Sequence, residues 1–441
     1  MALQNNEEVL IAEQGVAQAE GAVTEAYAGA LPNITVQAQY TGNFKKPAFF
    51  LPAEFFGGED DSTNGGSTGE SSGGPVKIEI GSDTEFAGAL RLDQTLYAFG
   101  RVGNAVKFAG IYRRMAGLGV DAARSSVLFA VTEAYSRVLL LEKLVDIQRQ
   151  GLEQARSHLR DIEEKHAQGA ESRFALQRAT VEVKNREPDL IRAENTLVLA
   201  SQDLKRIVGI ADEPDPLLSD TLGYSPMAAD VNRAMAEALL NRPEIRALEL
   251  NVEGQQRVVS IYKANILPVL GAFGQVSVQG QADKDDLAAA FDENSQVSMS
   301  AGLVFSVPVF DGFRTRGKVQ QARAGLSKAR HELAQARKAI RLDVTKAVQD
   351  LQGLTREYEA QRATVELAEE MYQIAETRFR SGISTQLELN DAELALNLAK
   401  TNYAETLYRY NVAVANLERA SGRTAGSAAR PAVDHSTGHE G

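Results

Sequence analysis

The amino-acid sequence predicts a mainly α-helical protein with a smaller β part, built from two copies of one unit. Three observations support this fold class. The chain matches itself over more than a hundred residues, two long stretches contain no proline, and four short segments alternate apolar with polar residues. A self-match of this length indicates a duplicated half-domain, so the two copies are expected to form equivalent units.

The internal repeat has two offsets. Along the helical part, residue n corresponds to residue n + 213, and near the start of each copy the offset becomes 236. The difference of 23 residues indicates an insertion in the first copy, between Pro32 and Phe86. The matched pairs include Gly169 with Gly382, Gly209 with Gly422, and Asn5 with Asn241.

The repeat sets the expected domain organisation. We expect repeat 1 at residues 1–209 and repeat 2 at 231–422, with a linker at 210–230 and a disordered, Gly/Ala/Ser/Pro-rich tail at 423–441. Repeat 1 should contain an opening helix at about 6–30, the strand pair 33–42/86–97, a long helix at 103–166 and a helix at 170–208. Repeat 2 should contain an opening helix at 231–265, the strand pair 269–279/296–309, a long helix at 315–380 and a helix at 383–420.

The strand predictions rest on a period of two. Ile34, Val36 and Tyr40 alternate with polar residues, as expected for a strand with one apolar and one polar face. The segments have about the 9–11 residues that a tilted strand needs to cross a bilayer. Four strands cannot close a membrane barrel, so strands that span a membrane would have to come from several chains. The polar residues 43–83 are expected to form a flexible loop.

The long helices are predicted from the absence of proline and from the spacing of apolar residues. At 1.5 Å per residue, each stretch gives on the order of 100 Å of helix. Apolar residues in the second copy recur every three or four positions, which is typical of a coiled coil, with one extra step of four between Ile340 and Val344. The shorter helices should return along the long ones as antiparallel hairpins.

Composition excludes several classes of protein. The chain has no cysteine, which rules out disulfides, thiolate metal sites and a cysteine nucleophile. Its formal net charge of −12, with acids and bases spread along the helices, argues against a nucleic-acid partner. The sequence contains no run of 18 or more apolar residues and so predicts no transmembrane helix. The opening MALQNNEEV lacks the features of a signal peptide; a secreted chain without its leader and a cytoplasmic protein both fit.

No catalytic, metal or cofactor site is predicted. His435 and His439 have a metal-like i,i+4 spacing, but a Gly/Ser-rich tail is a poor setting for a site. Residues 100–103, GRVG, lack the further glycine and the lysine of a phosphate-binding loop. Three other histidines are on charged helical stretches and are expected on the surface: His158, His166 and His331. We therefore expect a protein that is not an enzyme and uses no cofactor.

Four local signatures recur in both copies: the elements Asn5–Val9 and Asn241–Ile245, the Leu-Pro pairs at 31 and 267, the strand-to-helix corners Gln94–Arg101 and Val307–Gly317, and the hairpin tips Lys165–Ser172 and Arg378–Ser384. Together they resemble the TolC-like outer-membrane efflux protein family, the outer membrane factors, over residues 3–423. The first copy departs from the family's pattern at Glu7, where the family usually has proline.

The resemblance implies a homotrimer in the outer membrane of a Gram-negative bacterium, with a large periplasmic part. Each chain would give four strands to a twelve-stranded β-barrel and its helical hairpins to a periplasmic α-barrel. Such a channel-tunnel is a passive exit duct of a tripartite efflux or type I secretion system. It opens when a periplasmic adaptor (membrane fusion protein) and an inner-membrane transporter dock, and it is surrounded by outer-membrane lipid.

The resemblance also implies site residues. Glu388 and Asp391 match acidic residues that ring the periplasmic pore gate, and Phe379 and Ser384 stand where the family usually has a tyrosine and an arginine. Because Ala175 also replaces the family's aspartate, the usual closing contacts cannot form in the same way. Adaptor docking is implied at the hairpin tips, Gly169, Ala170, Gly382 and Ile383. The strand-to-helix corners carry Gly100, Arg101, Asp311, Gly312 and Arg314.

Simpler interpretations stay open. Glu388 and Asp391 can be ordinary solvated acids, and Gly169 and Gly382 can serve only the left-handed turn between helices. Two other classes of protein are possible. A periplasmic adaptor predicts one hairpin per chain flanked by β-domains, and a soluble structural coiled coil leaves the four strands of bilayer-crossing length unexplained. The twofold repeat with short strand pairs favours the duct over both.

Overall fold

The computed structural model describes residues 1–46, 48–51, 76–79, 83–211, 214, 218, 220–282 and 295–423. The chain divides into two compact units, and each takes residues from both copies of the repeat. The helical unit comprises Met1–Ala22, Phe108–Gln256 and the residues from Arg323 onward. The sheet unit comprises Val23–Lys107 and Arg257–Ala322.

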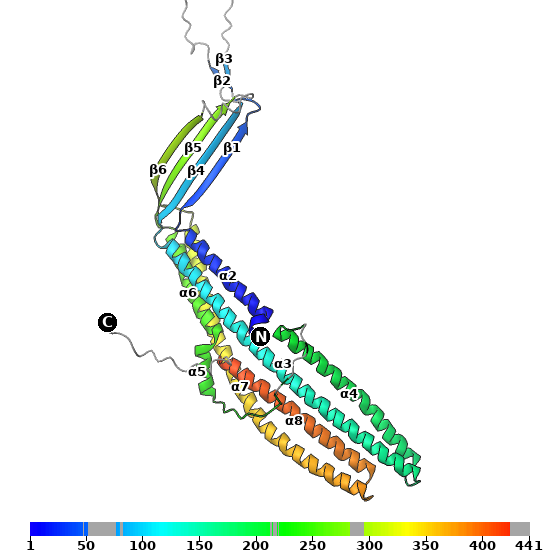
Figure 1. The fold of residues 1–441 in the computed structure, drawn as a ribbon. Helices are drawn as coiled ribbons and strands as arrows, with labels where there is room; N and C mark the ends of the chain where they lie inside the picture. Colours follow the sequence, from blue (N-terminus) through cyan, green and yellow to red (C-terminus); the bar gives the residue numbers. More distant parts are fainter. Residues whose placement is uncertain are drawn as a thin grey trace, which may run out of the picture. The chain divides into compact units, whose positions relative to one another are not determined.

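The sheet unit contains a four-stranded antiparallel sheet in the order β1-β4-β5-β6 (Figure 1). Its strands are β1 (Asn33–Gly42), β4 (Thr84–Tyr97), β5 (Val269–Ala282) and β6 (Ser295–Ser306). The register aligns one row of apolar residues across all four strands: Val36, Leu90, Val276 and Met299. The neighbouring row aligns Thr35, Arg91, Gln275 and Ser300. Because side chains alternate along a strand, these rows lie on opposite faces, one apolar and one polar.

A short antiparallel ribbon lies within the segment that the sequence predicts as a flexible loop, residues 43–83. Its strands are β2 (Ala48–Leu51) and β3 (Val76–Glu79). The loop prediction is wrong for these two stretches, because aromatic and β-branched residues favour an extended backbone even beside polar sequence. The acidic segment between the two strands lies outside the described residues.

Two helical hairpins dominate the helical unit (Figure 1). Hairpin 1 consists of α3 (Arg101–Ala167) and α4 (Arg173–Val208), with 67 and 36 residues. Hairpin 2 consists of α7 (Arg314–Arg380) and α8 (Gln386–Ser421), with the same two lengths. Apolar residues spaced three or four apart are buried along both hairpins, as the coiled-coil pattern predicts.

Tyr410 of α8 fixes the segment that follows the first copy. The side chain is completely buried in the core of hairpin 2. Its hydroxyl donates to the backbone oxygen of Ser225 at 2.7 Å and accepts from the backbone N–H of Met227 at 3.1 Å. Part of the predicted linker 210–230 is therefore held against α8.

The opening helix of the second copy, predicted as one helix over 231–265, is two helices. The first, α5 (Val231–Asn241), is followed by Arg242, whose backbone is extended, and α6 (Pro243–Ala264) begins with proline. Proline disfavours a helical backbone in the residue before it and is well tolerated as the first residue of a helix. The single-helix prediction was wrong because it ignored this local preference.

The first copy has the same break without a proline. There α1 (Ala2–Asn5) and α2 (Glu7–Ala28) are separated by the extended residue Asn6. The side-chain amide of Asn6 donates to the backbone oxygen of Ile207, at the end of α4, at 2.8 Å. The break is therefore supported by a tertiary contact of Asn6 in the first copy and by Pro243 in the second.

Both breaks lie against a glycine that ends the last helix of the same copy. Gly209 follows α4 and Gly422 follows α8, each with left-handed backbone, at φ values of 79° and 71°. A Cβ atom added to Gly209 would lie 2.8 Å from the Cβ of Asn5, and one added to Gly422 would lie 3.0 Å from the Cβ of Asn241. Glycine is required twice, by the backbone angle and by the close approach.

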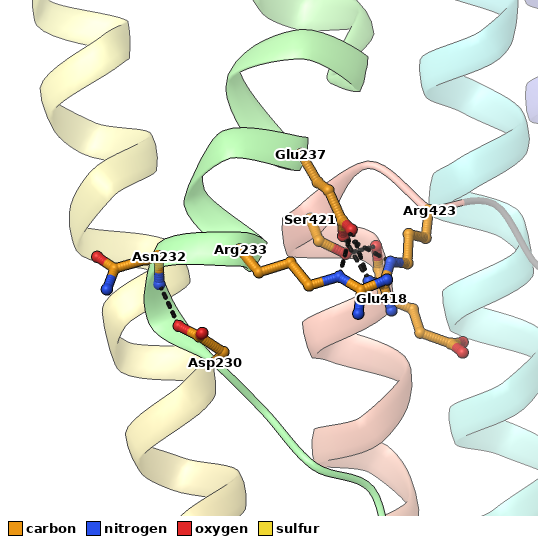
Figure 2. Close-up of polar contacts among 7 residues, drawn as sticks. All are labelled: Asp230, Asn232, Arg233, Glu237, Glu418, Ser421 and Arg423. Carbon is orange, nitrogen blue, oxygen red and sulfur yellow. Dashed lines mark hydrogen bonds and ion pairs between the residues drawn. The ribbon is translucent and has the colours of Figure 1, made fainter.

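Charged residues also join the end of α8 to α5 (Figure 2). Arg423 donates from Nε and Nη2 to the carboxylate of Glu237 at 2.6 and 2.8 Å, and Arg233 donates to it at 3.0 Å. These hydrogen bonds, that of Arg423 first, hold the pKa of Glu237 below its usual value. Arg423, predicted as the start of a disordered tail, is instead fixed by this contact, and residues 424–441 lie outside the described residues.

Candidate functional site

The strand-to-helix corners share an unusual backbone. Phe99 and Gly100 have φ values of 45° and 79°, and Gly312 and Phe313 have values of 65° and 64°. Each copy thus places two consecutive residues in the left-handed region, with phenylalanine and glycine in opposite order. Left-handed backbone costs about 1–2 kcal/mol for a residue with a Cβ. Each phenylalanine ring has a local aromatic partner: the ring centroids of Phe99 and Tyr97 are 4.7 Å apart, and those of Phe313 and Phe310 are 5.5 Å apart.

The charged corner residues start the long helices. Arg101 and Arg314 are the first residues of α3 and α7. The carboxylate of Asp311 accepts from the backbone N–H of Thr315 at 2.8 Å and so caps the first turn of α7. Hydrogen bonds from Thr315 hold the pKa of Asp311 below its usual range. The corners therefore have a clear local role in directing the chain from strand to helix.

The two hairpin tips have the same turn. Gly169 and Gly382 have φ values of 74° and 71°. The N–H of Ala170 bonds to the backbone oxygen of Lys165 at 2.8 Å, and that of Ile383 bonds to Arg378 at 2.9 Å. All four tip residues predicted for docking, Gly169, Ala170, Gly382 and Ile383, are exposed. Each tip therefore presents a small, hydrogen-bonded turn to solvent.

Glu388 and Asp391 lie on the exposed side of the first turns of α8. Thr385 caps this helix by accepting from the backbone N–H of Glu388, and the hydroxyl of Ser384 donates to the Glu388 carboxylate. The structure thus brings Ser384 and Glu388 together, and Asp391 follows one turn later. Glu388 is also an acid in the first turn of α8, where the helix dipole favours a negative charge.

Phe379 makes a contact between the hairpins. Its ring centroid lies 4.9 Å from that of His158 in α3, and Nζ of Lys165 lies 5.3 Å from the Phe379 centroid. His158 was predicted as a solvated surface residue, which is wrong, because this contact covers its ring and burial lowers its pKa. The prediction used only the charged residues that are close to His158 in the sequence. These residues belong to hairpin 1 and gave no information about its contact with Phe379 of hairpin 2.

One contact between the hairpins was missed at the sequence level. Arg186 of α4 forms an ion pair with Glu393 of α8. A signal was available: Glu393 lies between Leu389 and Leu396, which occupy the buried stripe of α8. Burying an unpaired charge costs free energy, so a glutamate at such a position indicates a nearby residue of opposite charge.

Two negative findings apply to the described part of the chain. Its His, Asp and Glu side chains nowhere gather in a group of three or more that could hold a metal ion. None of its helices combines the length and the apolar character needed to cross a lipid bilayer.

The sequence matches the profile of a known family. The match to the outer membrane efflux protein family covers residues 1–210 and 234–423, nearly the whole of both copies. The chain therefore belongs to this family, whose members are outer-membrane channels of Gram-negative bacteria and not enzymes.

Relatives and solved structures agree with this assignment. The pyoverdine export outer membrane protein OpmQ of Pseudomonas putida is 25% identical over 279 residues, 62% of this chain but only 57% of OpmQ. The outer membrane protein OprJ of Pseudomonas aeruginosa is 24% identical over 378 residues, 81% of this chain and 75% of OprJ. The crystal structure of the outer membrane protein VceC of Vibrio cholerae matches with a TM-score of 0.72 at 19% identity, covering 96% of this chain and 94% of VceC.

The likeness to VceC concerns the fold. It confirms the predicted fold class, a mostly helical chain with four antiparallel strands in one sheet. Family membership confirms the resemblance drawn from the four sequence signatures. The adaptor and the soluble coiled coil receive no support from these comparisons.

Proposed function

We propose that the chain is one protomer of a homotrimeric duct through which cargo leaves passively across the periplasm and outer membrane. The sheet carries this proposal. An apolar row and a polar row cross all four strands, and in the described residues β1 and β6 hydrogen-bond to another strand on one side only. The described part of the chain does not cover this apolar row, since Val36 and Met299 are 76% and 79% exposed.

Lipid is the environment that suits such a sheet. Each large apolar side chain that leaves water contributes about 1.5–3 kcal/mol. The strands have 10 to 14 residues, which is enough to cross a bilayer. Lipid cannot satisfy the N–H and C=O groups of an open edge, so β6 of one copy is proposed to pair with β1 of the next.

Three copies suit a duct better than two. Two chains would give eight strands, and side chains fill the interior of an eight-stranded barrel. Three chains give twelve strands, which leave a lumen lined by the polar row. Tyr97, Phe99, Phe310 and Phe313 are exposed beside the strand ends and would stand at the bilayer boundary, where aromatic rings are favoured.

The pore gate is proposed at the start of α8. Threefold symmetry would place six carboxylates around one opening, from Glu388 and Asp391 of each chain. Such a ring attracts cations and resists closure through repulsion between like charges. Ser384 would orient Glu388 through their hydrogen bond, and Phe379 would hold α7 against α3 near the tip.

The proposed partners are a periplasmic adaptor and an inner-membrane transporter, in a tripartite efflux or type I secretion system. Adaptor docking is proposed at the tips formed by Gly169-Ala170 and Gly382-Ile383, which are exposed and share one backbone turn. Docking there would act on the gate through the first turns of α8, because Thr385 and Glu388 follow directly after the second tip.

Reconstitution tests the duct and the gate together. Native mass spectrometry in detergent should give a trimer, and planar bilayers should show cation-selective conductance. The double variant Glu388→Gln/Asp391→Asn should lower the preference for cations on the order of tenfold, since a ring of one charge concentrates counter-ions by about that factor or more.

The matched control is Glu366→Gln, which removes an exposed acid that pairs with Arg362 on α7. It should leave selectivity unchanged. A monomer that is soluble without detergent would contradict the duct. A conducting trimer whose double variant keeps its cation preference would remove Glu388 and Asp391 from the gate and leave the duct in place.

A further inference from the structure

We infer that the ion pair between Arg186 and Glu393 joins the two hairpins of one chain and fixes the rotation of α8, which makes both residues positioning residues of the pore gate. The inference rests on the proposed function for what that rotation controls. Nη1 of Arg186 lies 2.9 Å from Oε1 of Glu393, and the two side chains are 18% and 9% exposed. Most charged contacts of the hairpins are far more exposed, so this contact stands apart.

Arg186 is oriented by its own helix. Its Nε donates to Glu182, one turn earlier in α4, at 2.7 Å, and this leaves Nη1 to meet Glu393. Oε1 of Glu393 is buried and, in the part of the chain that the structure describes, has the charge of Arg186 beside it without an aligned hydrogen bond. A buried carboxylate compensated in this way depends strongly on its one cation.

The third helix of the contact, α3, makes room for the guanidinium. A Cβ atom added to Gly151 would lie 2.7 Å from Nη1 of Arg186, the nitrogen that contacts Glu393, and 3.4 Å from Nδ2 of Asn397. Glycine inside a helix costs about 1 kcal/mol relative to alanine. Its presence where the guanidinium passes between α3 and α8 indicates a site built to admit that group.

The repeat shows that this contact is not part of the packing common to both copies. At the offset of 213, Arg186 corresponds to Ala399, Gly151 to Thr364, and Glu393 to Thr180. None of the three chemical types is retained, whereas the tip glycines and the helix-ending glycines are retained in both copies. The contact therefore belongs to the pairing of two unlike hairpins.

Fixing Glu393 also fixes the gate acids. Glu393 lies on the buried stripe of α8 with Leu389 and Leu396. Asp391 is two residues earlier, about 200° away around the helix, and so lies on the exposed side. Without Arg186, the buried carboxylate loses its counter-charge, and rotation or outward movement of α8 would bring it into water. Either motion would reorient Asp391 and Glu388.

Channel recording of the full-length protein tests the inference. The variants Glu393→Gln and Arg186→Gln should each raise the occupancy of the open state at least about fivefold, the low end of measured couplings between sites. Because the two residues act through each other, the double variant should match the stronger single variant and not the product of both effects. Equal occupancy in the unmodified protein and both single variants would overturn the inference.

Two controls separate positioning from general stability. Glu194→Gln removes an ion pair between α3 and α4, inside hairpin 1, and should leave the open-state occupancy unchanged. Glu393→Gln should also shift cation selectivity, but it should have no such effect in a Glu388→Gln/Asp391→Asn background. A variant that merely loosened the fold would change selectivity in both backgrounds, and that result would also overturn the inference.

A distance measurement keeps the test independent of conductance. The chain has no cysteine, so spin labels at Ala170→Cys and Ile383→Cys report on the two tips alone. The distance distribution within one chain, in trimers diluted with unlabelled protein, should broaden in Glu393→Gln and not in Glu194→Gln. If the unmodified protein does not conduct, the proposed function is wrong. If the tip-to-tip distance distribution does not broaden in Glu393→Gln, the positioning role is wrong.

Discussion

Gly209 of the first copy and Gly422 of the second occupy the same position in the repeat, adopt the same left-handed backbone and lie against Asn5 and Asn241. The proposed gate positions, in contrast, differ between the copies. The proposed gate comprises Glu388, Asp391, Phe379 and Ser384. In the repeat, at the offset of 213, these positions correspond to Ala175, Arg178, His166 and Glu171. The glycines that shape the backbone are the same in both copies, and the residues proposed for the pore gate are not. Divergence at the gate positions therefore distinguishes the second hairpin from the first.

The shared glycines give the largest expected effect. Gly209→Ala and Gly422→Ala should each lower the free energy of unfolding by about 2–5 kcal/mol, from left-handed backbone strain and overpacking against the asparagine. Denaturant midpoints measured for each variant check this. Gly110→Ala is the control, because a Cβ there meets nothing within 4 Å, and it should be neutral or slightly stabilising. If only one of the two variants lost much unfolding free energy, the two glycines would not be equivalent.

A residue found in one copy only gives an intermediate effect. Tyr410 corresponds to Leu197 in the first copy, and only the tyrosine hydroxyl bonds the Ser225–Met227 segment. Tyr410→Phe should cost about 1–3 kcal/mol, because it removes two partly buried hydrogen bonds, each worth about 0.5–1.5 kcal/mol. Thermal unfolding followed by circular dichroism measures the loss. Tyr112→Phe, at an exposed tyrosine, should shift the midpoint little.

The charged contact of Figure 2 gives the smallest effect and a pH dependence. Ile210 stands where the second copy has Arg423, so this contact too is specific to one copy. Because its pKa is lowered on folding, Glu237 stabilises the fold above its unfolded pKa of about 4.3 and loses that contribution as the pH falls. Glu237→Gln should cost at most about 1 kcal/mol at pH 7, since the pair is partly exposed.

Measurement of Glu237→Gln and the unmodified protein from pH 7 to pH 3 checks the sign. The difference between their unfolding free energies should shrink steadily toward acid. A difference that grew toward acid would contradict the assigned role of Glu237.

Local sequence determined much of the fold. Period-two alternation located the strands of the sheet, and apolar spacing with tip glycines located the hairpins, because each depends on residues close together in the chain. The break before α6 was also readable, from Pro243, although the equivalent break at Asn6 depends on a contact with Ile207 that local sequence does not reveal.

Contacts between the hairpins could not be predicted in the same way. The positions of His158 beside Phe379 and of Arg186 beside Glu393 depend on which face of one hairpin meets the other. Residues more than two hundred positions apart meet there, and one sequence provides no pattern that links them. The roles of the gate residues and of the docking tips remain proposals for the experiments above.

Among the residues that the structure describes, β1 and β6 each pair on one side only, which has a consequence for biogenesis. A lone chain with a finished sheet would present free donors and acceptors along two edges, an arrangement that promotes aggregation. In the proposed trimer those edges are completed only by other molecules, so barrel closure should slow sharply when newly exported chains are dilute. The hairpins rely on local contacts and can form first. Helical association would then gather three chains before any strand enters lipid.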